Sequence, residues 1–298
     1  MTSILKVDHL TKRFGLKKAV CDVSFEVFSG QAWGLLGPNG SGKTTTLSIL
    51  LGLIKATTGK FQWFGSHQTG AIHRTKIGSL LESPCFYPWL NAKQCLRMTA
   101  SIRGLENVEK EINRVLSIVG LQSEWQFRVG TFSQGMRQRL AIAGALLGEP
   151  KVLILDEPTN GVDAMGIIEI RNLIKGLISK GHTILISSHI LDEVEKICSH
   201  VLVLNKGRIL DQGAIKDVLH TDNVMEISSQ DSDRLEKSLA TIHLIEKYKR
   251  DGEIFTLWLK EGVVSTDINK EFSDKGIVLS HLELKKSSLE NHFLKLLG

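Results

Sequence analysis

The stretch GPNGSGKTT, Gly37 to Thr45, decides how the rest of the chain is interpreted. It fits the pattern G-x-x-x-x-G-K-[ST], in which a glycine-rich loop binds phosphate. Glycines let consecutive backbone N–H groups turn inward, and a helix that starts at Gly42 adds the positive end of its dipole. The pattern assigns Lys43 to the β- and γ-phosphates of a nucleotide and Thr44 to Mg²⁺.

The sequence on both sides of this loop separates it from an ordinary Gly/Ser turn. QAWGLL (31–36) predicts a buried strand that runs into the loop, and TTTLSILLGL (44–53) predicts a helix that leaves it. A strand, a glycine-rich loop and a helix in this order are the context in which the motif binds phosphate.

Length and composition limit the class of protein. With 298 residues, 42% of them hydrophobic, the chain can form one large domain and a smaller one. It has no run of eighteen apolar residues, and MTSILKVDHLTKRF (1–14) lacks the layout of a signal peptide, so we expect a soluble cytoplasmic protein. The net charge of +5 permits contact with an anionic membrane surface and does not indicate nucleic-acid binding. Free thiols are expected at Cys21, Cys85, Cys95 and Cys198, which lack metal-ligand spacing.

Two stretches before the loop alternate with period two. ILKVDH (4–9) and CDVSFEVF (21–28) are typical of antiparallel strands with one solvated face. Phe14 lies between them, and its ring can stack on an adenine, a contact worth about 1–3 kcal/mol. The alternative is a core phenylalanine at the end of a strand.

The chain beyond the loop helix changes from strands to helices. TGKFQWFG (58–65), with Gly59 and Gly65 as turns, and KIGSLLE (76–82) are expected strands. Residues 84 to about 135 have apolar residues at helical spacings and predict an all-helical insertion. The chain leaves this insertion at FSQGM (132–136), where Ser133 is expected to cap a helix whose N-terminus suits an anion.

Two further strands are predicted to end in polar residues. VLILDEP (152–158) indicates a strand buried on both faces, with Asp156 and Glu157 at its carboxyl end, where open α/β sheets place their chemistry. There Asp156 is suited to hold Mg²⁺ through water, and Glu157 to polarise the attacking water as a general base, a role worth roughly 10²–10⁴-fold. HTILISS (182–188) is a second buried strand and brings His189 to the same edge. The alternatives are a solvated turn for the two acids and a structural histidine.

The remaining pattern of the first 220 residues completes an α/β fold. An apolar stripe from Ile167 to Ile178 predicts a helix that ends at Gly181, and VLVLNKGRILDQG (201–213) predicts a closing hairpin. The fold class is therefore α/β: a P-loop NTPase sheet with an antiparallel β flank and a helical insertion.

Five motifs, GPNGSGKT, FSQGM, VLILDEP, NGVD and SSH, occur in the order and spacing of an ABC-type ATPase, which residues 3 to about 220 resemble. The resemblance implies ATP and Mg²⁺ as cofactors and a head-to-tail dimer, with each ATP held between the P-loop of one copy and FSQGM of the other. By resemblance, the ATP-binding residues are Phe14, Gly37, Pro38, Asn39, Gly40, Ser41, Gly42, Lys43, Thr44, Thr45, Ser133, Gly135 and Asp163. By resemblance too, the catalytic residues are Glu82, Glu157 and His189, and the metal-binding residues are Thr44, Glu82 and Asp156.

The chain departs from the family pattern at two places. Glu82 stands where most members carry glutamine, and a carboxylate there can still bind Mg²⁺ or orient water. The same substitution is similar to that of bacitracin and lantibiotic-immunity exporters, which raises export of an antibiotic, drug or peptide. FSQGM replaces the commoner LSGGQ but keeps Ser133 and Gly135, so we expect activity to survive.

Residues 221–298 predict a small α+β domain. NVMEIS (223–228), EIFTLWL (253–259) and GIVLSHLEL (276–284) are expected strands, and residues 233–242, 263–272 and 288–297 expected helices. The layout resembles the tail of ATPases that serve ABC-2 type exporters. Neither His281 nor His292 has partners at ligand spacing. A role of this domain in dimerisation or regulation is a hypothesis.

The resemblance also implies a partner. A transport ATPase without membrane spans needs a separate permease, here of the ABC-2 type, through which it would lie on the inner face of the cell membrane. Four residues, Phe86, Tyr87, Pro88 and Trp89, either receive a helix of that permease or simply pack the insertion. A soluble ABC protein that acts on ribosomes or chromosomes is the alternative function, but such proteins usually carry two ATPase units or long coiled coils. A regulatory module with little turnover is disfavoured by Glu157 and His189.

Overall fold

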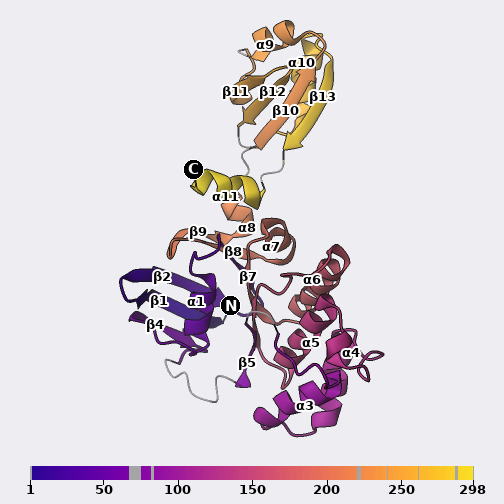
Figure 1. Ribbon diagram of the computed structural model, residues 1–298. Helices are drawn as coiled ribbons and strands as arrows, with labels where there is room; N and C mark the ends of the chain where they lie inside the picture. Colours follow the sequence, from indigo (N-terminus) through magenta and orange to yellow (C-terminus); the bar gives the residue numbers. More distant parts are fainter. Residues whose placement is uncertain are drawn as a thin grey trace. The chain divides into compact units, whose positions relative to one another are not determined.

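The computed structural model describes residues 2–66, 75–81, 84–219, 223–239, 241–260, 262–285 and 288–297. The chain divides into two compact units, residues 1–218 and 219–298, each with a sheet of its own (Figure 1).

The first unit is built on a six-stranded sheet with the order β5-β6-β7-β3-β8-β9. Its strands are β5 (Ile77–Leu80), β6 (Val152–Asp156), β7 (Thr183–Ser188), β3 (Ala32–Leu36), β8 (His200–Asn205) and β9 (Arg208–Ala214). The first five are parallel, and β9 returns antiparallel to β8 as the predicted hairpin. The α/β fold class predicted from the sequence is confirmed.

The apolar run of β6 is explained by two separate hydrophobic cores. Leu153 and Leu155 belong to a core shared with helices that follow β5 in the chain. Val152 and Ile154 belong to a second core, shared with α1 (Lys43–Leu50). Because successive side chains of a strand point to opposite faces, a strand between two cores has to be apolar at every position.

A three-stranded antiparallel sheet, β2-β1-β4, completes the second of these cores. It consists of β1 (Ser3–Phe14), β2 (Lys17–Phe28) and β4 (Thr58–Trp63), so both strands predicted near the N-terminus are confirmed. The prediction of a turn at Gly59 was wrong: this residue lies within β4 at φ +85°. A Cβ atom at Gly59 would lie 2.2 Å from the carbonyl oxygen of His9, so glycine allows the two strands to approach closely.

The first unit contains the predicted helical insertion. That insertion contains α3 (Ala92–Ile102), α4 (Val108–Ile118) and the short 3₁₀ helix η1 (Val129–Thr131), and it leads into α5 (Gln134–Leu146). Asn91 begins α3 with a capping box, in which its side chain accepts from the Gln94 amide and the Gln94 side chain accepts from the Asn91 amide. The remaining helices of this unit are α6 (Ala164–Ser179), α7 (Leu191–Ile197) and α8 (Ile215–Val218).

The second unit is a four-stranded antiparallel sheet with the order β11-β12-β10-β13. Its elements are β10 (Asn223–Ser229), α9 (Ser232–Leu239), β11 (Ile245–Asp251), β12 (Ile254–Leu259), α10 (Ser265–Asp274), β13 (Leu279–Lys285) and α11 (Leu289–Leu297). Three strands and three helices agree with the sequence prediction. Strand β11 was missed because its residues, IEKYKRD, lie at the edge of the sheet and are mostly exposed, so they show no apolar alternation.

All four cysteines are free thiols. Burial raises the pKa of Cys95 to about 11 and raises that of Cys198 as well, so both thiols stay neutral.

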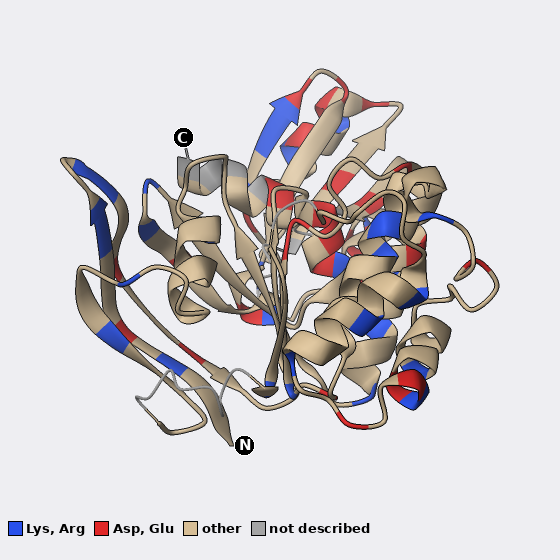
Figure 2. Ribbon diagram, turned by 60° about the horizontal axis from the view of Figure 1, so that its bottom comes forward, with Lys and Arg blue, Asp and Glu red and all other residues tan. Residues whose placement is uncertain are grey.

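Basic and acidic residues are interspersed along the strands and helices (Figure 2). Within the described ranges, no helix has both the length and the apolar composition that a membrane crossing requires.

Candidate functional site

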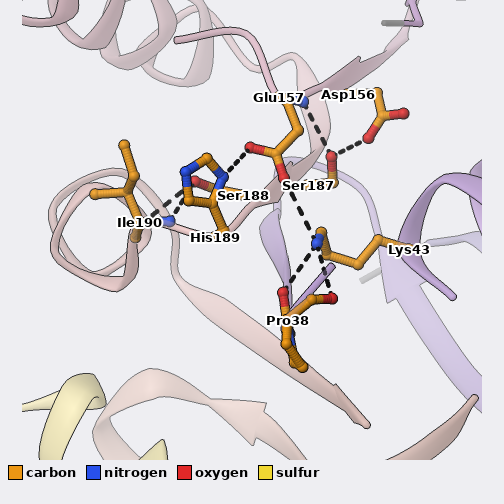
Figure 3. Close-up of polar contacts among 9 residues, drawn as sticks. Pro38, Lys43, Asp156, Glu157, Ser187, Ser188, His189 and Ile190 are labelled. Atoms are coloured by element: carbon orange, nitrogen blue, oxygen red, sulfur yellow. Dashed lines mark hydrogen bonds and ion pairs between the residues drawn. The ribbon is translucent and has the colours of Figure 1, made fainter. Parts of the chain in front are cut away.

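Three neighbouring parallel strands bring several of the predicted site residues to one edge of the sheet. Strand β7 lies between β6 and β3, and Ser187 is in register with Asp156, as Ser188 is with Leu36. The residues that follow the ends of these strands therefore meet in space, although they come from three distant parts of the chain (Figure 3).

The loop from Gly37 to Gly42 connects β3 to α1 and needs its glycines. Gly37 has a φ of +152°, and a Cβ atom there would lie 2.2 Å from the carbonyl oxygen of Leu204. Gly42 has a φ of +109°, and a Cβ atom there would lie 2.5 Å from the carbonyl oxygen of Ala19. Side chains at either position would strain the backbone and push the loop away from its neighbours.

The polar groups of this loop fit an anion. The N-terminus of α1 has no side-chain cap among the described residues, so its amides keep their capacity to donate. Ser41 Oγ is buried and has no hydrogen-bond partner in the described part of the chain. Lys43 Nζ donates to the carbonyl oxygens of Gly37 at 2.8 Å and Pro38 at 3.5 Å. A phosphate group would supply the acceptors that these donors need.

A cavity of about 320 Å³ lies over this loop and includes Phe14. Phe14 is 52% exposed, so the alternative of a core phenylalanine was wrong. Lys12 Nζ lies 4.9 Å from the centre of the ring. The lining residues are Phe14, Lys17, Ala19, Asn39, Gly40, Gly42, Lys43, Thr44, Thr45 and Glu157.

Glu157 connects this cavity to His189. Its Oε1 lies 3.5 Å from Lys43 Nζ, and its Oε2 lies 2.8 Å from His189 Nδ1 (Figure 3). The backbone of Glu157 has a φ of +49°, which a residue with a side chain adopts only where neighbouring contacts hold it. The Glu157 side chain is 19% exposed and Asp156 is 2% exposed, so the alternative of a solvated turn was wrong.

Ser187 is a site residue that the sequence reasoning missed. Its hydroxyl donates to Asp156 Oδ1 and accepts from the Glu157 backbone N–H at 3.0 Å. The SSH motif marked this position, but only its histidine was given a role. The register between β6 and β7, which reveals the pairing, is a tertiary property.

The residues of the FSQGM motif form a second group together with Asp163. Ser133 caps α5 as predicted, since its Oγ accepts from the Met136 amide at 3.1 Å. Asp163 caps α6 by accepting from the Gly166 amide at 3.1 Å. A Cβ atom at Gly135 would lie 3.6 Å from Gly166 Cα, so the starts of the two helices are close together. None of these residues is among the described residues that line the cavity over the P-loop, and Glu82 lies outside the described residues.

The aromatic cluster at the start of the insertion is divided between core and surface. Phe86 packs against the core of the helices, as the packing alternative expected. Tyr87 and Trp89 are 53% and 62% exposed, with ring centres 5.2 Å apart, so packing does not account for them. A groove of about 470 Å³ runs along α3 nearby in the sequence, lined by Leu90, Gln94, Arg97, Met98, Ser101 and Ile102.

Comparison with known proteins gives consistent matches. The ABC transporter family profile matches residues 20–160. The bacitracin transport ATP-binding protein BcrA of Bacillus licheniformis is 41% identical over 100% of this chain and 98% of its own length. The lantibiotic transport ATP-binding protein SrtF of Streptococcus pyogenes is 40% identical over 70% of this chain and 89% of its own. The structure of cbiO1 from Clostridium perfringens, part of the ABC transporter complex cbiONQ, matches 74% of this chain and 92% of that chain at 30% identity and a TM-score of 0.68.

Proposed function

The chain belongs to the ABC transporter family and is an ATP-binding, ATP-hydrolysing transport subunit, and from this premise we propose that it powers an ABC-2 type permease that exports an antibiotic, drug or peptide. The observation that carries the ATPase assignment is the Glu157 carboxylate, which lies between Lys43 and His189 at the edge of the phosphate-binding loop. The export assignment is supported by the two relatives named for bacitracin and lantibiotic transport.

Each residue of the site has a proposed task. The amides of the loop and Lys43 bind the phosphates, and the exposed ring of Phe14 stacks on the base. Thr44 and Asp156 would hold Mg²⁺, which would neutralise charge on the phosphates. Glu157 accepts a proton from the attacking water, and His189 orients the Glu157 carboxylate through their 2.8 Å contact. We also propose that Glu82 binds the metal ion or orients the attacking water.

A second copy of the chain is proposed to complete the site. Ser133, Gly135 and Asp163 lie together at the starts of α5 and α6, outside the set of described residues that line the cavity. In a head-to-tail dimer, the N-terminus of α5 in one copy, with the positive end of its helix dipole, would face the phosphates held by the other. This arrangement gives the two groups of residues one common ligand.

The permease is proposed to bind the insertion. Tyr87 and Trp89 expose large apolar surfaces, and Met98 and Ile102 on α3 are 44% and 85% exposed. Exposed aromatic and apolar side chains of this kind are typical of protein interfaces. Binding to the permease would hold the chain at the inner face of the membrane. Replacing both Tyr87 and Trp89 with alanine should release it from membranes that contain the permease and leave ATP binding unchanged.

The ATPase mechanism is tested by Glu157→Gln. The amide keeps the shape of the side chain but cannot accept a proton as a general base, so turnover should fall roughly 10²–10⁴-fold. ATP should then trap a dimer, which size-exclusion chromatography detects. Glu253→Gln, an exposed position in the second unit, is the control and should keep wild-type turnover. Equal turnover in the Glu157 variant and the wild type would contradict the mechanism.

The export function is tested in cells that express the chain together with its permease. They should tolerate bacitracin or a lantibiotic better than cells that carry Glu157→Gln. Equal sensitivity to every antibiotic, drug and peptide tested would refute the proposed class of substrate, while leaving the ATPase assignment intact.

A further inference from the structure

Ser187 occupies a position between the two acids of the site. It is fully buried at the end of β7, where it is the register partner of Asp156 on β6. Its hydroxyl contacts the side chain of Asp156 and the backbone of Glu157, the two residues with different proposed tasks (Figure 3). One hydroxyl therefore joins the metal-binding carboxylate to the residue that acts on water.

The direction of these two hydrogen bonds follows from the chemistry of the groups. The Glu157 amide N–H can only donate, so Ser187 Oγ is the acceptor in the 3.0 Å contact. A serine hydroxyl has a single proton and a carboxylate oxygen accepts, so that proton points to Asp156 Oδ1. In the described part of the chain this hydrogen bond occupies one carboxylate oxygen, and the other could take a cation and its water.

We propose that Ser187 is a positioning residue for the metal site, an inference that rests on the proposed function. By donating to Oδ1, its hydroxyl would leave the other Asp156 oxygen to bind Mg²⁺, and it would help to hold Glu157 in its left-handed backbone conformation at φ +49°. Groups that hydrogen-bond to a metal-binding carboxylate orient it, and their loss typically weakens metal binding or activity by about 10–100-fold.

The two contacts differ in how easily they can be replaced. The Glu157 amide has a second acceptor, the carbonyl oxygen of Ser187 at 3.2 Å, which remains whatever the side chain at position 187. Asp156 is 2% exposed, and Ser187 is its hydrogen-bond donor among the described residues. Loss of the hydroxyl should therefore act mainly on Asp156, and so on the dependence of the reaction on Mg²⁺.

The experiment compares Ser187→Ala with a matched control on the same strand. Thr183 is 1% exposed at the other end of β7, where its hydroxyl accepts from the Gly30 amide at 2.9 Å. Thr183→Val removes a buried hydroxyl far from the site, so it reports the purely structural effect of such a loss. Ser187→Thr keeps the hydroxyl, and Ser187→Cys replaces it with a weak donor should the alanine variant not fold.

Two measurements on the full chain separate positioning from stability. Fluorescence titration with trinitrophenyl-ATP gives nucleotide affinity with and without Mg²⁺, and ATPase assays give the Mg²⁺ concentration for half-maximal turnover. For Ser187→Ala we expect that concentration to rise about 10–100-fold while affinity without Mg²⁺ stays unchanged. Ser187→Thr and Thr183→Val should keep the wild-type Mg²⁺ dependence.

The outcomes distinguish this inference from the function on which it rests. A wild-type Mg²⁺ dependence in Ser187→Ala, an equal shift in Thr183→Val, or a full shift in folded Ser187→Thr would overturn the role of Ser187. Failure of the wild-type chain to bind trinitrophenyl-ATP would instead overturn the proposed function.

Discussion

A buried ion pair holds α6 against α7, the helix that follows His189, and it allows a quantitative prediction. Arg171 on α6 donates from Nη2 to Glu193 Oε1 at 2.8 Å and from Nε to Oε2 at 3.0 Å. The Arg171 side chain is 19% exposed and that of Glu193 is 8% exposed. The pair is therefore bidentate and largely removed from water, unlike a surface salt bridge.

Arg171→Met would leave the Glu193 carboxylate buried without its partner. Removing one member of a buried pair typically costs about 3–5 kcal/mol, whereas an exposed pair contributes about 0–1 kcal/mol. With Glu193 at 8% exposure, we expect a loss near the lower end of the first range, about 3 kcal/mol. Arg171→Met combined with Glu193→Leu should recover most of that loss, because two apolar side chains leave no charge unpaired.

The assay is urea unfolding followed by tryptophan fluorescence. Four of the five tryptophans, Trp33, Trp63, Trp89 and Trp125, lie in the first unit, so the signal reports mainly on the unit that contains the pair. The control is Arg97→Met, which breaks an ion pair with Glu109 whose side chains are 50% and 57% exposed. A loss below about 1 kcal/mol for Arg171→Met, or no recovery in the double variant, would refute the reasoning.

Three further predictions concern the cavity and the N-terminal sheet. Gly42→Ala should lower both the affinity for trinitrophenyl-ATP and the thermal stability, because alanine at φ +109° is strained and its Cβ would lie 2.5 Å from a backbone carbonyl oxygen. The control is Gly176→Ala, which has open space around it and should lower neither the affinity nor the stability. Phe14→Ala should weaken ATP binding by about 1–3 kcal/mol in a calorimetric titration, whereas Phe14→Tyr should keep the wild-type affinity. Equal affinities of the alanine and tyrosine variants for ATP would exclude stacking. The hydrogen bond that the His9 ring donates to the Asp22 carboxylate raises the pKa of His9, so His9 adds stability below its ordinary pKa of about 6.5 and loses that contribution as pH rises through the raised value. The melting temperature of the wild type relative to His9→Asn should therefore be higher at pH 6 than at pH 8, and a pH-independent difference would contradict this.

Sequence patterns were sufficient where the cause of a structure is local. The run VLIL predicted a doubly buried strand because each of its residues must meet one of two cores. Gly37 and Gly42 predicted the phosphate-binding loop because their backbone conformations exclude other residues. Ser133 was recognised as a helix cap because its partner, the Met136 amide, is three residues away.

Other features depended on contacts between distant segments. The polar strand β11 is specified by pairing with β12 at a sheet edge, which leaves no apolar signal in its own residues. The exposure of Phe14 and of Trp89 depends on what the rest of the chain covers. The role of Ser187 depends on the register of β6 against β7, which joins residues 31 positions apart. The motifs along the chain thus identify which groups take part in the chemistry, whereas only the packed sheet determines which of them touch, because hydrogen bonds between strands form across space rather than along the sequence.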